Sequence, residues 1–272
     1  CIFKNIIKFS VTILCVNPTL LRFIAIEHTK KRYNNLTLKK IYVSGSVLDD
    51  QTYELAHRAF DRNPIYNVYG LSELAPRVTA QTESCCKSNS VGKPIHGVEI
   101  AIVNEIGETV IAGDRGIIHV NSPSVFDGYI SGNLKYKSLY RGWLNTGDTG
   151  YIDESGELHV CGRIDDIMII NSHKIYPIDI ENVVCTIAGV RECAVSKIVY
   201  RGMETIGCLY TGEVAIQDII ANIRSRLASY EIPKRFIRAD SLPKSANGKL
   251  LRNDVRQILE DYSNECTIHK NE

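Results

Sequence analysis

The chain has 272 residues, 44% of them hydrophobic, and its 32 basic and 31 acidic side chains leave a formal net charge of +1. This length allows roughly two domains, and the ordinary composition is typical of a globular protein with a sizeable core. The near-neutral charge argues against a nucleic-acid partner and gives no support for binding to an anionic membrane.

Cysteine usage and the opening segment both favour a cytoplasmic protein. The nine cysteines form an odd set without Cys-x-x-Cys spacing, which disfavours a disulfide framework and a zinc site and favours free thiols. We interpret Cys85-Cys86 as two small loop residues rather than a redox pair. Lys4 and Lys8 interrupt the first apolar run and Asn17-Pro18 ends it, so we expect a buried strand there and no membrane span.

From residue 9 to residue 70 the pattern predicts alternating strands and helices. Residues 9–15 are predicted to form a strand and 20–26 a helix, and further strands are predicted at Lys40–Val43 and Ile65–Tyr69. Asp49 and Asp50 are expected to cap the helix between these strands. Ligands of such sheets gather at the carboxyl ends of the strands, so we expect Gly45-Ser46 and Tyr69-Gly70 to face one crevice.

The remaining chain changes character twice. Short strands separated by turns between residues 91 and 160 predict an antiparallel, barrel-like subdomain. Beyond Asp165 the predicted elements are a strand at 167–170, a helix opened by Pro177, a strand at 192–199, a helix at 216–227, a strand at 235–237 and a helix at 253–262. These elements predict an α+β lobe.

Two charged residues stand at neighbouring ends of one predicted hairpin. Asp148 precedes the first strand, at 149–152, and Arg163 follows the second, at 157–161. A carboxylate beside a guanidinium suits a ligand with adjacent hydroxyls and an anionic group, such as a nucleotide. A plain ion pair is the alternative, and the spacing alone does not decide between them.

Four segments, taken together, resemble the signatures of the adenylate-forming enzymes, which include acyl-CoA synthetases, luciferases and the adenylation domains of peptide synthetases. They are Tyr-Gly-Leu-Ser-Glu at 69–73, Asn-Thr-Gly-Asp at 145–148, Gly-Arg-Ile-Asp at 162–165 and Pro-Lys-Ser-Ala-Asn-Gly-Lys at 243–249. The resemblance extends from about Asn17 to Val255, and the 170–177 segment makes it strongest to fatty-acid or aryl-acid CoA ligases.

The resemblance implies an α/β plus α+β fold in two parts. Residues 1–163 would be the C-terminal part of the large AMP-binding domain, with the barrel-like subdomain at about 91–162. Residues 164–272 would be a small mobile C-terminal lobe, with the hinge near 163–166 at Asp165. Without the resemblance, Asp165-Asp166 would be interpreted as a solvated linker.

The resemblance also implies roles for individual residues. The ATP- or AMP-binding set would be Gly45, Ser46, Tyr69, Gly70, Ser72, Asp148 and Arg163. Glu73 would hold Mg²⁺, and Lys249 would be the catalytic lysine that neutralises charge at the α-phosphate. The simpler alternatives are a core aromatic for Tyr69, a helix-terminal acid for Glu73 and a solvated side chain for Lys249.

The implied activity is that of an acid-thiol ligase using ATP, Mg²⁺ and coenzyme A. It would convert a carboxylic acid, with a fatty acid as first choice, to an acyl adenylate and then to its CoA thioester. The alternatives are transfer to an acyl-carrier protein and a non-catalytic nucleotide-binding remnant. No transmembrane segment is expected, and the sequence makes no prediction of oligomeric state.

Two departures from the family pattern stand out. The Ser/Thr/Gly-rich phosphate loop ending in Pro-Lys-Gly is absent from this sequence, and with it the N-terminal half of the large domain. We therefore expect a fragment or one piece of a split enzyme, and whether this chain acts alone stays open. Ser172 stands where the family usually has glycine, in the loop expected to line the path of the CoA thiol.

Overall fold

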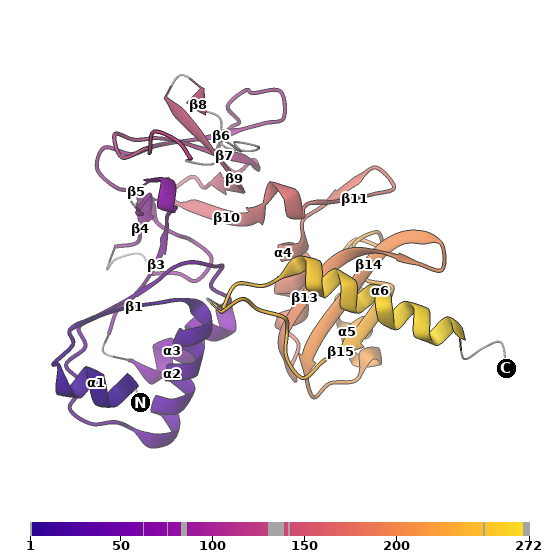
Figure 1. Ribbon diagram of the computed structural model, residues 1–272, viewed down its shortest axis with the longest axis horizontal. Coiled ribbons are helices and arrows are strands. Elements are labelled where there is room, and N and C mark those ends of the chain that lie inside the picture. Colours follow the sequence, from indigo (N-terminus) through magenta and orange to yellow (C-terminus); the bar gives the residue numbers. More distant parts are fainter. Residues whose placement is uncertain are drawn as a thin grey trace. The chain divides into compact units, whose positions relative to one another are not determined.

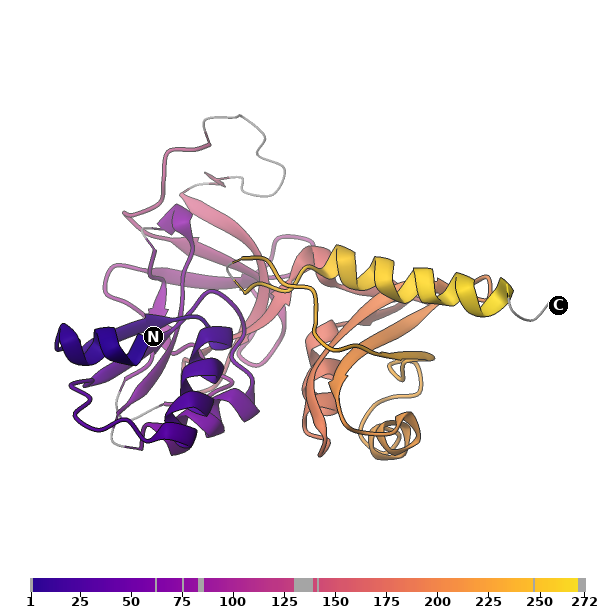
Figure 2. The same ribbon diagram turned by 60° about the horizontal axis from the view of Figure 1, so that its bottom comes forward.

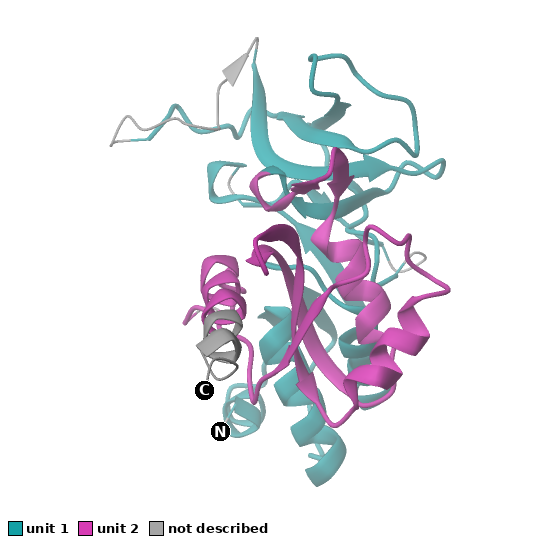
Figure 3. Cartoon of the chain, turned by 90° about the vertical axis from the view of Figure 1, so that its right-hand side faces the viewer, with its two compact units in different colours: residues 1–164 teal, residues 165–272 magenta. Residues whose placement is uncertain are grey.

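The computed structural model describes residues 2–61, 63–74, 76–82, 86–129, 139–140, 142–246 and 248–268. The chain divides into two compact units, the first ending at Ile164 and the second beginning at Asp165 (Figures 1 and 3). This boundary falls inside the segment 163–166. Among the described residues no helix combines the length and the apolar character needed to cross a membrane.

The first unit begins with a sheet of five strands, in the order β1-β2-β3-β4-β5. The first three strands are parallel neighbours, and β4 and β5 add antiparallel pairs. The strands are β1 (Ile13–Val16), β2 (Lys40–Val43), β3 (Ile65–Tyr69), β4 (Thr79–Ala80) and β5 (Lys93–Pro94). The predicted bounds of the second and third strands agree with the structure.

Helices α1 (Ile2–Lys8), α2 (Pro18–Lys31) and α3 (Asp50–Ala59) belong to this part of the unit. Asn17 Oδ1 accepts a hydrogen bond from the Leu20 amide at 2.7 Å, and Asp49 Oδ1 accepts one from the Thr52 amide at 2.8 Å. Each side chain thereby satisfies a backbone donor that its helix leaves unpaired. The predicted cap at Asp49 is confirmed.

The prediction of a buried strand in the opening segment was wrong for residues 2–8, which form α1. Phe3 and Ile6 are buried, with 0% and 2% of their surface exposed. They are three positions apart, so they lie on one face of a helix, and Lys4 and Lys8 are left on the exposed side. The strand that follows is β1, which starts four residues later than predicted, at Ile13 rather than at residue 9.

A second sheet completes the first unit. Its strands are antiparallel in the order β10-β9-β7-β6, and β8 pairs with β9. They are β6 (Glu99–Val103), β7 (Gly116–Asn121), β8 (Leu139–Tyr140), β9 (Trp143–Ile152) and β10 (Leu158–Arg163). Its core includes Ile118, Val120, Leu144 and Leu158. The expected barrel-like subdomain is therefore, in the described residues, an open sheet with β10 and β6 as its edges.

The second unit has a three-stranded sheet in the order β13-β14-β15 and a hairpin of β11 and β12. The elements are the 3-10 turn η2 (Ile164–Asp166, which crosses the boundary), β11 (Met168–Ile170), β12 (His173–Ile175), α4 (Pro177–Cys185), β13 (Val190–Tyr200), β14 (Met203–Gly212), α5 (Ile216–Ile223), β15 (Arg235–Arg238) and α6 (Arg252–Ile268). Helices α4 and α5 pack on one face of the sheet, and α6 packs on the other (Figure 2).

Alternate residues of β13 face these two helical layers. Cys193 and Val195 belong to the core beneath α4 and α5, whereas Ala194 and Ile198 contact the core under α6. Strand β14 lies between β13 and β15 and is buried along most of its length. A strand covered on both faces has no polar alternation, which explains why the pattern analysis did not predict β14.

The backbone of the turn between β11 and β12 explains why the adenylate-forming enzymes usually have glycine at the position of Ser172. Asn171 and Ser172 both have positive φ, of 47° and 65°, as the central residues of a type I′ hairpin turn do. A side chain other than glycine is strained in this conformation.

We predict that Ser172→Gly stabilises the second unit by about 1 kcal/mol, because it relieves this strain. Amide hydrogen exchange of β11 and β12 would measure the gain. Ser241→Gly is the matched control, since Ser241 is exposed and is not among the positive-φ residues. Equal effects of the two substitutions would contradict the prediction.

Candidate nucleotide site

Two turns follow neighbouring parallel strands of the first unit. Gly45, with φ of 97°, and Ser46 come after β2, and Gly70 comes directly after β3. A Cβ atom on Gly70 would lie 1.6 Å from the carbonyl oxygen of Pro76, so only glycine fits there. Both turns lie at the carboxyl edge of the sheet, where the sequence pattern placed them, and Gly45 and Ser46 are exposed.

Tyr69, Asp148 and Arg163 meet at one carboxylate. The hydroxyl of Tyr69 donates to Asp148 Oδ2 at 2.6 Å, and Arg163 Nη1 donates to Asp148 Oδ1 at 3.1 Å. Asp148 and Arg163 are directly paired across β9 and β10. The structure thus brings together three predicted site residues from two sheets, and it contains the ion pair that was the alternative interpretation.

Gly147 allows the guanidinium to approach. It has φ of 70°, and a Cβ atom at this position would lie 2.9 Å from Arg163 Nη2. Arg163 Nη1 also donates to the carbonyl oxygen of Thr146 at 3.0 Å. Arg163 therefore donates to both the backbone and the carboxylate of the Thr-Gly-Asp segment. Gly147, which has no side chain, leaves room for its guanidinium.

The Asp148 carboxylate also affects the phenol of Tyr69. Burial, followed by the negative charge and the hydrogen bond of Asp148, raises the pKa of Tyr69 well above its ordinary value. The phenol therefore stays protonated at neutral pH and keeps donating to Asp148. Each oxygen of a carboxylate has two lone pairs, so Asp148 can accept further hydrogen bonds from a ligand.

Ser72 and Glu73 lie on the 3-10 turn η1 (Ser72–Leu74). Ser72 is exposed and Glu73 is half-buried. The hydroxyl of Tyr129 donates to Glu73 Oε1, and the Phe126 amide donates to the Glu73 carbonyl oxygen at 3.0 Å. Glu73 is thus held in place by the segment that follows β7.

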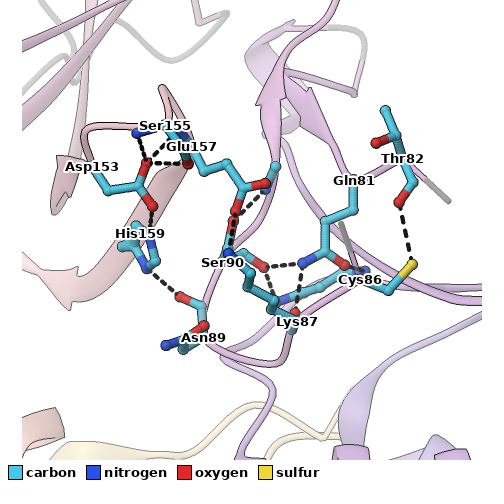
Figure 4. A network of polar contacts seen from close by, with 12 residues as sticks. Gln81, Thr82, Cys86, Lys87, Asn89, Ser90, Asp153, Ser155, Glu157 and His159 are labelled. Atoms are coloured by element: carbon cyan, nitrogen blue, oxygen red, sulfur yellow. Dashed lines mark hydrogen bonds and ion pairs between the residues drawn. The ribbon is translucent and has the colours of Figure 1, made fainter. Parts of the chain in front are cut away.

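A polar network around the turn of the β9–β10 hairpin connects it to the loop before β5 (Figure 4). His159 lies with Nε2 2.9 Å from Asp153 Oδ2 and Nδ1 2.7 Å from the Asn89 carbonyl oxygen. Asp153 Oδ1 accepts from the Ser155 amide and hydroxyl and from the Glu157 amide, at 2.9, 2.6 and 2.9 Å. The network fixes the hairpin whose other end carries Asp148 and Arg163.

Ligand atoms of Asp153, Glu157 and His159 lie within 4.8 Å of one another, as they would around a metal ion. Asp153 and His159 already bond to each other, and Lys87 Nζ lies 3.7 Å from Glu157 Oε2. A cation would have to displace these contacts, so we interpret the cluster as a clamp on the turn.

In the second unit, Lys249 ends a tight turn. The Gly248 amide donates to the Ser245 carbonyl oxygen at 2.8 Å, and the Ser245 amide donates to the Lys249 carbonyl oxygen at 2.8 Å. Gly248 has φ of 77°, and Lys249 is exposed. Asn247 of the same motif lies outside the described residues. Asp165 is exposed on η2.

Comparison with known proteins assigns both units to one family. Residues 1–130 match the family model of the AMP-binding enzymes, and residues 179–249 match that of the AMP-binding enzyme C-terminal domain. The chain belongs to the AMP-binding enzymes. These are the adenylate-forming enzymes that the four sequence segments resemble, and the predicted family is confirmed.

Several relatives carry names of CoA ligases. An uncharacterised acyl–CoA ligase, YhfT of Bacillus subtilis, is 33% identical over 82% of this chain and 46% of its own length. A 2-succinylbenzoate–CoA ligase of a Geobacillus species is 29% identical over 95% of this chain and 54% of its own length. The chain thus spans about half the length of these relatives.

Solved structures confirm the predicted fold class. O-succinylbenzoate coenzyme A synthetase of Bacillus subtilis, solved in complex with AMP, superposes with a TM-score of 0.79 at 27% identity, over 94% of this chain and 53% of that one. The amide bond synthetase McbA of Marinactinospora thermotolerans reaches a TM-score of 0.86 at 24% identity, over 95% and 54%.

Sequence reasoning gave no role to two residues that hold the site. Thr146 accepts the Arg163 guanidinium through its carbonyl oxygen, and its hydroxyl donates to the Ile118 carbonyl oxygen at 2.8 Å. Its position beside Gly147 was a usable signal. Tyr129 lies 56 positions from Glu73, and no local pattern relates the two.

We predict that Gly147→Ala lowers the free energy of unfolding of the first unit by about 1–3 kcal/mol, through backbone strain and contact with Arg163. Urea unfolding followed by the fluorescence of Trp143, the single tryptophan, measures this unit. Gly113→Ala separates the causes, because Gly113 has φ of 91° with nothing within 4 Å of its Cβ position. A loss no larger than that of Gly113→Ala would contradict a role in admitting Arg163.

The lowered pKa of Asp153 predicts that the stability of the first unit depends on pH. Burial alone would raise its pKa, but hydrogen bonds from Ser155, His159 and the Glu157 amide hold it well below the ordinary value of 3.8. The ionised carboxylate therefore stabilises the fold above that value, and the stabilisation is lost as the pH falls below it.

Asp153→Asn should lower the free energy of unfolding at pH 6 and flatten its decline between pH 5 and about 3. The same Trp143 measurement at each pH tests this. The exposed residue Asp114 provides the control variant Asp114→Asn, which should keep the wild-type profile. A wild-type slope in Asp153→Asn would show that the prediction is wrong.

Proposed function

We propose that this chain carries the nucleotide-binding and lysine-bearing parts of an AMP-forming acid-thiol ligase. The reaction would join a carboxylic acid to ATP as an acyl adenylate with release of pyrophosphate, and then transfer the acyl group to a thiol with release of AMP. The observation that carries this proposal is the convergence of Tyr69 and Arg163 on the Asp148 carboxylate, in a chain of the AMP-binding family.

A nucleotide suits this cluster chemically. Asp148, 8% exposed, would accept the two ribose hydroxyls, and Arg163 would lie near the ribose and the phosphate. The ring of Tyr69, held by its hydroxyl, would stack on adenine, and Gly45 and Ser46 would line the base.

The phosphates would require groups from further along the same edge. Ser72 is exposed and would contact a phosphate. Glu73 offers a carboxylate oriented by Tyr129, which fits Mg²⁺, a cation held in proteins by one or two carboxylates together with substrate phosphates. Bound Mg²⁺ would neutralise phosphate charge.

In the second unit, Lys249 is our candidate for the catalytic residue. Its ammonium group would stabilise the charge that develops as the carboxylate attacks the α-phosphate. Delivery would require the second unit to pivot near Asp165, and a second pose would present residues 169–174 for thioester formation.

For the carboxylic acid and the thiol acceptor, we propose chemical classes and no single compound. The relatives' names include 2-succinylbenzoate–CoA ligases, which favours an acid that contains an aromatic ring alongside the fatty acid expected from the sequence. Coenzyme A is the proposed thiol, with an acyl-carrier protein as the alternative, and a cytoplasmic location remains a prediction.

Nucleotide binding is the first test. AMP titrated calorimetrically into the full chain should bind, and Asp148→Asn should weaken binding at least about tenfold, because hydrogen bonds to a charged carboxylate are lost. Absence of AMP binding, or equal affinity in Asp148→Asn, would contradict the proposal.

ATP–pyrophosphate exchange with a panel of acids, including 2-succinylbenzoate and fatty acids, tests the first half-reaction. We expect Lys249→Ala to reduce exchange by about 10²-fold or more while AMP still binds. The exposed lysine variant Lys234→Ala should behave as wild type. AMP binding without exchange for any acid would favour the non-catalytic remnant.

A further inference from the structure

Arg252 is the first residue of α6 and follows Lys249 by three positions. Its Nη1 and Nη2 atoms donate to the two carboxylate oxygens of Glu181 at 2.7 and 3.1 Å, and its Nε atom donates to Asp166 Oδ2 at 3.0 Å. Nη1 also lies 3.3 Å from the Val195 carbonyl oxygen. One guanidinium thus joins η2, α4, β13 and α6.

The partners of Arg252 are themselves fixed. Glu181 is 7% exposed, and its Oε1 also accepts the Val195 amide at 2.9 Å. Burial alone would lower the pKa of Arg252, but the carboxylates of Glu181 and Asp166 raise it above its ordinary value. The charge is therefore permanent, and the bidentate geometry gives the contact a defined direction.

The contact with Asp166 bridges a large separation in sequence. Asp166 and Arg252 are 86 positions apart, and Asp166 is the second residue of the second unit. It therefore adjoins Asp165, the proposed pivot. A rotation of the backbone at residue 165 would displace its neighbour Asp166. The ion pair between Asp166 and Arg252 would then displace the start of α6.

Two other described contacts of the Lys249 turn lie within the turn or connect it to the sheet. The Leu251 amide donates to the Pro243 carbonyl oxygen at 3.0 Å, which shapes the turn. Lys244 pairs with Glu192 of β13, which connects the turn to the sheet. Among the hydrogen bonds described for residues 243–252, the one from Arg252 to Asp166 is the direct link to η2.

We propose that Arg252 is a positioning residue that couples η2 to the Lys249 turn, so that the two move as one body. This inference rests on the proposed role of Lys249. A purely stabilising ion network would differ in one respect, because its loss would reduce stability without changing the turn selectively.

Hydrogen exchange of the full chain tests the coupling without requiring activity. In Arg252→Ala and Asp166→Ala we expect the Ser245, Gly248 and Leu251 amides to exchange at least about tenfold faster, while amides in the centre of β14 keep their rates. Asp166→Ala leaves the Glu181–Arg252 contacts in place, so it remains informative if Arg252→Ala unfolds the lobe. The control is Arg256→Ala, which removes an exposed pair with Glu260 on the same helix.

Kinetics supply the second readout. If the wild type catalyses exchange, Asp166→Ala should lower kcat about tenfold or more with KM for ATP unchanged, because the nucleotide-binding candidates lie in the first unit. Arg252→Lys keeps the charge but loses the bidentate contact. Its kcat should lie between those of Arg252→Ala and the wild type.

Wild-type exchange rates of the turn amides in Asp166→Ala would overturn the inference, even if Arg252→Ala accelerates them, because Arg252→Ala also removes the Glu181 contacts. So would equal acceleration in Arg256→Ala. An inactive wild type would count against the proposed function, and the amide rates would still decide the coupling.

Discussion

The candidate nucleotide site depends on one carboxylate. Asp148 is nearly buried and receives the Tyr69 hydroxyl on one oxygen and the Arg163 guanidinium on the other. A buried charge without partners would be costly, so these contacts stabilise it and also fix an aromatic ring and a cation around it. The lone pairs that remain on its oxygens are the acceptors on which the proposed ribose contact depends.

Each unit has a tight turn, closed by short-range hydrogen bonds, on an element that carries candidate site residues. The β9–β10 hairpin is clamped at its turn by Asp153 and His159, and its other end carries Asp148 and Arg163. The Lys249 turn closes through Ser245 and Gly248, and Arg252 follows three positions after Lys249. Gly147 and Gly248 both have positive φ, and at Gly147 the missing side chain leaves room for the Arg163 guanidinium.

Local patterns predicted the elements that have clear ends. Strands β2 and β3 are short apolar runs bounded by turns, and the Asp49 cap follows from one side chain. Strand β14 and helix α1 were missed because burial on both faces and a short amphipathic run give ambiguous periodicity. Pairing of Asp148 with Arg163 followed from the hairpin, but contact with Tyr69, 79 positions away, is set by tertiary packing. The family resemblance assigned Tyr69 and Asp148 to one nucleotide, but it did not predict the hydrogen bond between them.

The central claim is that adenine nucleotide binds at the carboxyl ends of β2 and β3, beside Asp148. Photolabelling of the full chain with 8-azido-ATP, followed by peptide mapping, tests it most directly. We predict labelling within residues 44–46 or 69–73 that ATP suppresses by competition and that Asp148→Asn reduces. Labelling confined to other peptides, or unaffected by ATP, would contradict the account.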